Sequence, residues 1–370
     1  MISDASLVDD AVISTLYLGL DTKKMISANT TTEGFWTATD NGELVCQKTY
    51  NQYVWIPVAD INDMVMCESR TASSECNIEL VNGVLQCTNQ AHSSTATDLC
   101  GRLYGSGTNF GTQDPATYTY KSGFREPAVV TNKSSATSLE NYLDNQGTGN
   151  YDCDPANSIL KEDGTTSVTG ASNILTELKR QFNNMAKSVY TYGGFYVGRY
   201  EAGYVDNVVT SKKATPVANI LNAGSYNSST NLGGVGNWYG LYNKIIKANT
   251  GTVSQMIWGC QWDQVMKFVN GKTDGNGDSY NVTTAKTTSG TTRHTGSKAA
   301  TGANTNDLVQ NIYDLEGNFF EWTSTASYAN CRARRGGIYS GSYATSNRDS
   351  NGPTITYDGY SVRPGLYVSL

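Results

Sequence analysis

Five residue types are missing from the end of this chain. From Thr323 to Leu370 there is no Lys, Glu, Gln, Met or Trp, although these types make up 52 of the preceding 322 residues. A segment of 48 residues with that composition would contain about eight of them. Folding alone does not remove these five types together, because they differ in size, charge and burial preference. The absence therefore calls for an explanation other than packing.

The chain also lacks charge and histidine. Charged residues make up 16% of the sequence and the net charge is −6, which argues against a nucleic-acid-binding protein because such proteins show a basic face. Low charge with 24 Tyr also argues against disorder. The two histidines, His92 and His294, are too few for imidazole-rich metal sites or for most histidine-based catalysis.

Long apolar runs are absent as well. None approaches the roughly 20 residues of a membrane-spanning helix, so no membrane insertion is expected. Asp4, Asp9 and Asp10 lie where a secretory signal peptide carries positive charge, and no such signal is visible. The chain is therefore expected either to leave its cell by a non-Sec route or to be assembled inside the cell and released, as virion proteins are.

The eight cysteines show no C-x-x-C pair and no zinc-like spacing. Five of them lie within residues 46–100, so one or two local disulfides there and reduced, buried thiols both remain open.

Two helices are predicted by apolar periodicity. Ile174, Leu178, Phe182, Met185 and Val189 share one face of a helix over 173–189, with Ser172 as the expected N-cap and Gly193 at the exit. A second amphipathic helix is predicted over 258–269, and a short one over 59–66.

Strand patterns are few and loops are long. Strands are predicted over 53–58, 194–202 and 365–370, and Asn/Ser/Gly-rich loops over 68–170 and 210–240. Two main helices, a few short strands and long loops indicate an α+β fold. We assign residues 1–45 to an N-terminal arm, linker or oligomerisation segment, and residues 46–370 to one domain with a variable segment 324–364.

Several blocks resemble, in order, the formylglycine-generating-enzyme type of C-type lectin-like domain. That family's pattern reads N-x-x-D-L-x-G-N-V-W-E-W-T, R-V-x-R-G-G-S-W and a closing G-F-R. The chain has NIYDLEGNFFEWT at 311–323, RARRGGIY at 332–339 and SVRPGLYV at 361–368. GGFYVGRYEA at 193–202 and QMIWGCQWDQVMKF at 255–268 resemble upstream elements of the same family. The resemblance covers about residues 53–370 and implies a C-type lectin-like fold.

The composition of the tail further resembles the variable proteins of diversity-generating retroelements. In that family a reverse transcriptase randomises template adenines, mostly in AAC codons, and so produces N-N-C codons. Those codons cannot encode Lys, Glu, Gln, Met or Trp, which are the five types missing after Trp322. The resemblance implies a non-enzymatic, hypervariable protein that binds protein or glycan ligands on another cell or virion, in a phage receptor-binding or bacterial surface role.

Positions between the expected scaffold residues are the candidates for this variable surface, since Tyr, Ser, Gly and Asn are typical of adaptable binding sites. They are Ser324, Ser327, Tyr328, Ala329, Ala333, Ile338, Ser340, Ser342, Ala344, Thr345, Asn347, Asp349, Asn351, Thr354, Thr356, Tyr357, Asp358 and Tyr360. About half are expected to line one contiguous surface. A fixed-specificity lectin or adhesin on the same fold remains the alternative, and an oligomer is compatible with either.

Catalysis is not expected. Oxidases of the family carry two cysteines after R-G-G, and the corresponding positions here are Gly341 and Ser346, which cannot supply a thiolate. The other aromatic and arginine residues of the blocks are interpreted as core and scaffold: Trp258, Trp262, Phe319, Phe320, Trp322, Arg332, Arg335 and Arg363.

Calcium is the one cofactor that the resemblance suggests. The family holds a structural calcium on the loop equivalent to 314–321, where Asp314 and Glu321 would give side-chain oxygens and Gly317 and Phe319 backbone carbonyls. The alternative is that Asp314 caps a turn and Glu321 pairs with an arginine. Asp274–Asp278 (DGNGD) likewise fits either a calcium loop or a plain turn.

Overall fold

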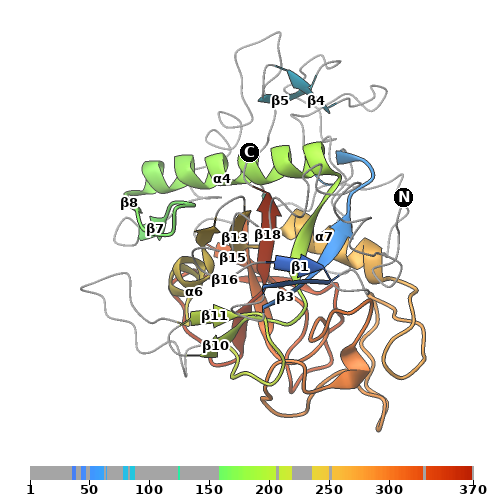
Figure 1. The fold of residues 1–370 in the computed structure, drawn as a ribbon. Coiled ribbons are helices and arrows are strands. Elements are labelled where there is room, and N and C mark those ends of the chain that lie inside the picture. The colour runs from blue at the N-terminus through green and yellow to red at the C-terminus, as the bar shows by residue number, and fades with distance from the viewer. Residues whose placement is uncertain are drawn as a thin grey trace, which may run out of the picture.

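The computed structural model describes residues 36–38, 43–46, 51–61, 64, 78–81, 84–87, 124–125, 158–205, 208–218, 236–249, 252–327 and 331–368. These residues form a mixed helix-and-sheet architecture (Figure 1), which confirms the predicted α+β class. None of the helices in these ranges is long and apolar enough to cross a membrane.

The larger sheet has seven strands in the order β1-β2-β3-β9-β18-β13-β12, and every neighbouring pair is antiparallel. Strands that are distant in sequence lie side by side at its centre, where β18 is placed between β9 and β13. The strands are β1 (Trp36–Ala38), β2 (Glu43–Cys46), β3 (Gln52–Pro57), β9 (Gly194–Gly198), β12 (Lys247–Asn249), β13 (Thr252–Met256) and β18 (Pro364–Val368). β1 and most of β2 belong to residues 1–45 and hydrogen-bond into this sheet.

The second sheet carries most of the C-terminal segment. Its order is β16-β15-β14-β17, with β6 also paired to β14, and β14 and β17 run parallel. The strands are β6 (Phe124–Arg125), β14 (Phe320–Ser327), β15 (Cys331–Arg335), β16 (Arg348–Asn351) and β17 (Tyr360–Val362). Three two-stranded ribbons complete the strands: β4 (Ile78–Val81) with β5 (Val84–Cys87), β7 (Ser158–Leu160) with β8 (Ser167–Thr169), and β10 (Gly203–Val205) with β11 (Val208–Thr210).

The long helix α4 (Ala171–Tyr192) forms where the periodicity predicts it and packs on β9 and β18. All five residues of the predicted apolar face, 174, 178, 182, 185 and 189, are buried. The expected cap at Ser172 is wrong, because the helix starts at Ala171 after Gly170 and has no side-chain cap. Gly193 ends it in the left-handed conformation with φ 78°, as glycine permits at little cost.

Helix α7 (Gly259–Val269) lies between the sheets and contacts β3, β14 and β15. Trp262, Val265, Met266 and Val269 are fully buried, as the amphipathic pattern predicts. The expected helix over 59–66 lies largely outside the described residues, which include only residues 59–61 and 64 of it.

A third helix, α6 (Trp238–Ile245), corrects the expectation of two main helices and of a loop extending to residue 240. Its sequence WYGLYNKI contains a glycine and three aromatic residues, which are weak helix formers. Asn237 caps it by accepting a hydrogen bond from the backbone N–H of Gly240 at 2.9 Å. Trp238, Tyr239, Leu241 and Tyr242 are buried, so tertiary packing stabilises this helix. A short 3₁₀ helix, η5 (Thr305–Asp307), precedes the motif at 311–323.

Candidate functional site

Two residues of the motif at 311–323 have the left-handed conformation, as does Gln310 directly before it, with φ 48°. Asn311 has φ 64° and Asp314 has φ 61°. Asparagine and aspartate tolerate this region better than other L-residues, which accounts for the residue types at these two positions. The Asp314 Oδ2 atom accepts the backbone N–H of Gly302 at 2.6 Å. Asp314 therefore fixes a turn between two loops.

Glu321 pairs with an arginine from the other end of the C-terminal segment. Arg363 donates to both carboxylate oxygens, from Nε at 2.9 Å and from Nη2 at 2.5 Å. The same guanidinium donates to the carbonyl oxygens of Gly198 and Tyr313 at 2.9 and 2.8 Å. Arg363 is fully buried and Glu321 is 1% exposed, so this is an interior, charge-assisted pair.

This donor set is a poor fit for calcium. The arginine supplies the positive charge that calcium would bring, and it occupies both oxygens of Glu321. Gly317 lies against the backbone of His294, and the ring of Phe319 is buried against Tyr339. Within the described part of the chain, no three His, Cys, Asp or Glu side chains converge as a metal-binding group. No step of the proposed function passes through a metal.

Two carboxylate oxygens beside this pair have no hydrogen-bond partner: Oε2 of Glu201 and Oδ1 of Asp314. Burial raises the pKa of Glu201 well above its ordinary value, and the nearby charges of Asp314 and Glu321 raise it further. Burial also raises the pKa of Asp314, to about 6. A neutral carboxyl is therefore favoured for Glu201.

The loop at 274–278 is a turn held by an arginine. The Asp274 Oδ1 atom accepts the backbone N–H groups of Asn276 and Asp278, each at 2.9 Å. Its Oδ2 atom accepts Nη2 of Arg293 at 2.8 Å, and Nη1 of Arg293 donates to Glu316 at 2.9 Å. The arrangement of this loop is therefore that of a plain turn. The guanidinium of Arg293 lies between the carboxylates of Asp274 and Glu316.

The two glycines of the R-G-G block are required by close backbone approach. A Cβ atom on Gly337 would lie 1.9 Å from the carbonyl oxygen of Glu316, and one on Gly336 would lie 2.7 Å from that of Leu315. Gly336 also has φ 74°. The block therefore packs its backbone directly on the motif at 311–323.

A buried acidic residue of α7 anchors the tail. Asp263 accepts Nη2 of Arg335 at 2.8 Å on one oxygen and Nη2 of Arg348 at 2.9 Å on the other. All three side chains are at least 95% buried. With Arg363, these arginines fix the C-terminal segment at three points, which confirms the scaffold interpretation of Arg335 and Arg363. Arg332 is buried too, over the ring of Trp238 at 4.7 Å.

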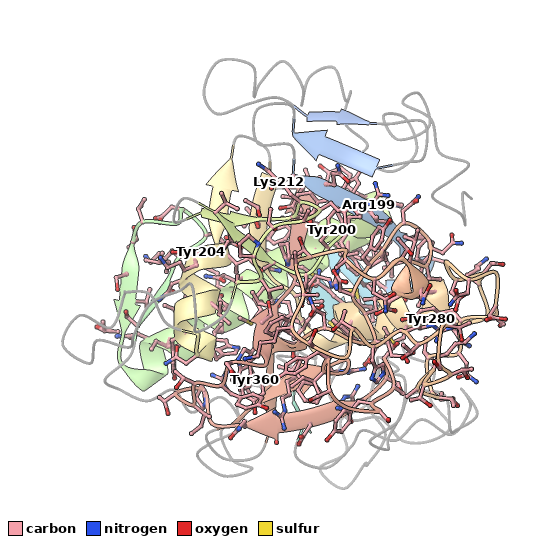
Figure 2. All side chains as sticks on the ribbon, turned by 90° about the horizontal axis from the view of Figure 1, so that it is seen from below. Arg199, Tyr200, Tyr204, Lys212, Tyr280 and Tyr360 are labelled. Carbon is pink, nitrogen blue, oxygen red and sulfur yellow. The ribbon has the colours of Figure 1, made fainter. Side chains whose placement is uncertain are left out.

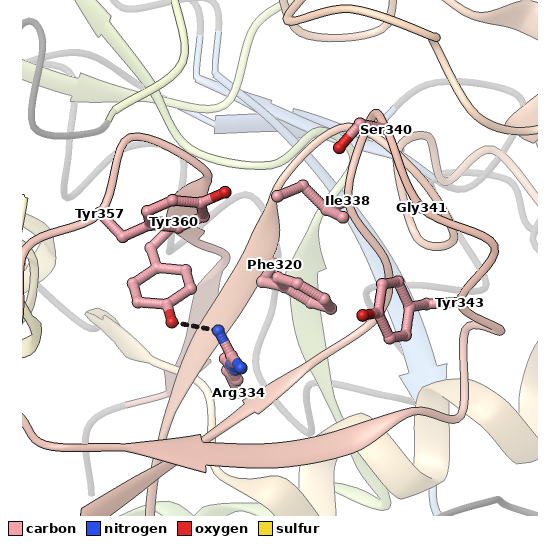
Figure 3. A pocket seen from close by; sticks show the side chains of 8 residues that line it. All are labelled: Phe320, Arg334, Ile338, Ser340, Gly341, Tyr343, Tyr357 and Tyr360. Carbon is pink, nitrogen blue, oxygen red and sulfur yellow. Dashed lines mark hydrogen bonds between the residues drawn. The ribbon is translucent and has the colours of Figure 1, made fainter.

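An open pocket lies on the second sheet, with a volume of about 370 Å³ (Figure 3). Two T-shaped aromatic pairs flank it, Tyr357 with Tyr360 at 4.9 Å and Phe320 with Tyr343 at 5.0 Å. The complete lining is Phe320, Arg334, Ile338, Ser340, Gly341, Tyr343, Tyr357 and Tyr360. Tyr360 lies well apart from Arg199 and Tyr200 (Figure 2), and no residue of the segment 193–202 lines the pocket.

The candidate variable positions divide by exposure. Those that are exposed or half-buried are Ser340, Ser342, Asn347, Asp349, Asn351, Thr354, Thr356, Tyr357 and Asp358. Those that are buried are Ser324, Ala333, Ile338, Ala344, Thr345 and Tyr360. Ser327 ends β14, and its side chain, like residues Tyr328 and Ala329, lies outside the described residues. Four candidates line the pocket: Ile338, Ser340, Tyr357 and Tyr360.

Four lining residues were not among the candidates: Phe320, Arg334, Gly341 and Tyr343. Strand alternation could have indicated Arg334, because it precedes the inward-facing Arg335 on β15 and so points to the opposite face. Gly341, which corresponds to the first cysteine position of the oxidases, lies in the pocket wall. The second, Ser346, is buried.

No protein-family model and no curated protein matches this chain. Among solved structures, PvdO from Pseudomonas aeruginosa is similar over 48% of this chain and 82% of its own, at 12% identity and a TM-score of 0.29. The P3c and U1 variants of Major Tropism Determinant are similar over 94% of this chain and 98% of theirs, at 14% and 16% identity and TM-scores of 0.29 and 0.27. Similarities this weak do not establish a common fold, and the proposal below rests on the residues of this chain.

Proposed function

We propose that this chain is a non-enzymatic ligand-binding protein whose segment 324–364 is diversified by a retroelement on a C-type lectin-like domain of the formylglycine-generating-enzyme type. It binds a protein or glycan ligand on another cell or virion, in a phage receptor-binding or bacterial surface role. One observation carries the proposal. Seven of the eight residues that line the pocket follow Trp322, in the region that lacks Lys, Glu, Gln, Met and Trp.

The anchoring of the segment supports this function. Arg335, Arg348 and Arg363 are buried in ion pairs with Asp263 and Glu321, while most positions between them reach the surface. Side chains on a rigid frame can be replaced without loss of the fold, and binding residues are commonly presented in this way. The exposed Tyr343 and Tyr357 offer contact area with few rotatable bonds.

A fixed-specificity lectin or adhesin would use the same pocket, and the coding DNA separates the two. We expect codons in the 324–364 region to end predominantly in C at exposed positions. We also expect an imperfect copy of this 3′ end nearby, differing at template adenines and adjacent to a reverse transcriptase gene. Codons with no excess of terminal C, and no such copy, would overturn diversification.

A displayed library tests the same proposal on the protein. N-N-C codons are introduced at the exposed positions Ser340, Ser342, Thr354 and Tyr357, and in a matched library at the buried positions Ser324, Ala333, Thr345 and Tyr360. We expect most members of the first library, and few of the second, to resist protease. Equal survival of the two libraries would contradict the division of the segment into frame and variable surface.

A further inference from the structure

The walls of the pocket are aromatic and only partly covered. Tyr343 and Tyr357 are 45% and 43% exposed, whereas their partners Phe320 and Tyr360 are 5% and 4% exposed. Ile338 lies between the two pairs (Figure 3). Exposed ring surface above a buried apolar floor favours an apolar group that removes both rings from water.

The polar groups of the pocket are one guanidinium, that of Arg334, and four hydroxyls, those of Ser340, Tyr343, Tyr357 and Tyr360. Arg334 is the only charged lining residue, and the lining contains no carboxylate and no side-chain amide. A sugar presents several hydroxyls that donate as well as accept, and it would find no carboxylate or side-chain amide oxygen in this lining to accept from it. A ligand with one or two acceptor oxygens fits these polar groups better.

Arg334 is held firmly on one side and weakly on the other. Its guanidinium lies 4.7 Å from the ring centres of Phe320 and Tyr360, and it donates from Nη1 to the hydroxyl of Tyr360. Its Nη2 atom pairs with Asp349, whose side chain is 51% exposed. An ion pair with so exposed a partner contributes little, so an incoming acceptor can replace Asp349 at small cost.

We infer that the pocket binds an uncharged apolar side chain of a protein partner and that Arg334 donates to a backbone carbonyl beside it. This inference rests on the proposed function and names the ligand class for the same site. Asp349 remains next to Arg334 after its displacement and offsets the charge of the guanidinium. A carboxylate then gains little more attraction than a carbonyl oxygen does and costs more to remove from water, so a neutral acceptor is favoured over an acidic one.

Three small probes test the inference on the full chain by saturation-transfer NMR: N-acetyl-L-leucinamide, N-acetyl-L-leucine and methyl α-D-glucopyranoside. We expect the amide to bind, and the carboxylate to bind at least about fivefold more weakly, because Asp349 offsets the charge of Arg334 and the carboxylate costs more to desolvate. Y343A and Y357A should lose amide binding. I355A should keep it, because Ile355 is 44% exposed but does not line the pocket. D349N should bring the carboxylate close to the amide.

Each other result overturns the inference. Binding of the glucoside without the amide would mean a glycan ligand. Equal binding of amide and carboxylate to the unaltered chain would remove the role of Asp349. No binding of any probe would mean that the pocket is not an anchor for a side chain. Diversification would stand in all three cases if the coding DNA shows the adenine-directed pattern, so the two failures are distinguishable.

Discussion

Glu321 and Arg363 form a two-pronged ion pair that brings together the two ends of segment 324–364. Glu321 lies three residues before position 324, and Arg363 lies next to its end at 364. Both ends of the segment are therefore fixed in the interior, by this pair and by the carbonyl oxygens that accept hydrogen bonds from Arg363.

Arg363→Met should destabilise the fold by about 3–5 kcal/mol, since it leaves the buried carboxylate of Glu321 without its partner. The measurement is the free energy of unfolding in urea. Arg363→Lys should recover only part of the loss, because a single ammonium cannot reproduce the fork and the carbonyl bonds. An unchanged midpoint for Arg363→Met would contradict the anchoring role of this pair.

Tyr357 and Tyr360 should separate binding from stability, although both line the pocket. Tyr360→Ala should cost about 3–5 kcal/mol, because Tyr360 is 4% exposed and packs on Trp322 at 5.0 Å. Tyr357→Ala should cost less than about 1 kcal/mol, because its ring is 43% exposed. Thermal and urea unfolding of the two variants measure this difference. Equal losses would place Tyr357 in the core and remove it from the binding surface.

Gly337→Ala should destabilise the chain by about 3 kcal/mol or more, at the upper end for overpacking, because the added methyl meets a backbone oxygen that cannot turn away. Gly277→Ala is the matched control. Gly277 has φ 85° and no atom within 4 Å of an added Cβ, so only the backbone cost of about 1–2 kcal/mol applies. If Gly277→Ala loses as much free energy of unfolding as Gly337→Ala, the close approach of Gly337 to Glu316 does not explain why position 337 requires glycine.

The buried carboxyl of Glu201 should make stability fall as pH rises. Its pKa in the folded chain is above the ordinary value of 4.5, so the folded state holds more protons than the unfolded state above that pH. The stability from the neutral carboxyl is complete below about pH 4.5 and is lost as pH rises through the folded pKa. The melting temperature of Glu201→Gln, relative to the unaltered chain, should therefore increase from about pH 5 to about pH 8.

The exposed Asp349→Asn is the control for this pH series, since it also removes one negative charge. A difference in melting temperature that is constant with pH for Glu201→Gln would mean that Glu201 is ionised in the folded chain throughout.

Removal of calcium should leave the melting temperature unchanged, because Arg363 occupies both oxygens of Glu321. The measurement is thermal unfolding with EGTA and with added calcium. A rise of several degrees with calcium would show that Asp314 and Glu321 bind the ion despite this pairing.

Local sequence predicted the elements that carry their own periodicity. The apolar spacing in α4 and α7 gave both helices, and β3, β9 and β18 appear at the predicted apolar runs. Helix α6 was missed because its stability comes from burying Trp238 and Tyr242 rather than from the helix propensity of its residues. The cap at Ser172 was wrong for a related reason, since the start of a helix depends on the preceding turn.

The sequence predicted the segment that contains most of the pocket, but not which of its residues line the pocket. Burial of Ile338, Ala344 and Thr345 could not be read from the chain, because residues 338–346 form no regular element whose period would separate inner from outer positions. Arg334 lies in the pocket because β15 pairs with β14, and Tyr343 lies there because its ring packs on Phe320.

The sequence by itself determined where the region without Lys, Glu, Gln, Met and Trp begins, since composition can be counted without a fold: the last residue of these five types is Trp322. Tertiary structure alone decided which positions of that region are exposed. Asp263 pairs with Arg335 and Arg348, each more than 70 residues away in sequence, and Glu321 pairs with Arg363. These pairs make the three arginines buried anchors. Such long-range pairs leave no local signal: only their place in the family-like blocks indicated Arg335 and Arg363 as scaffold residues, and nothing in the sequence indicated Arg348.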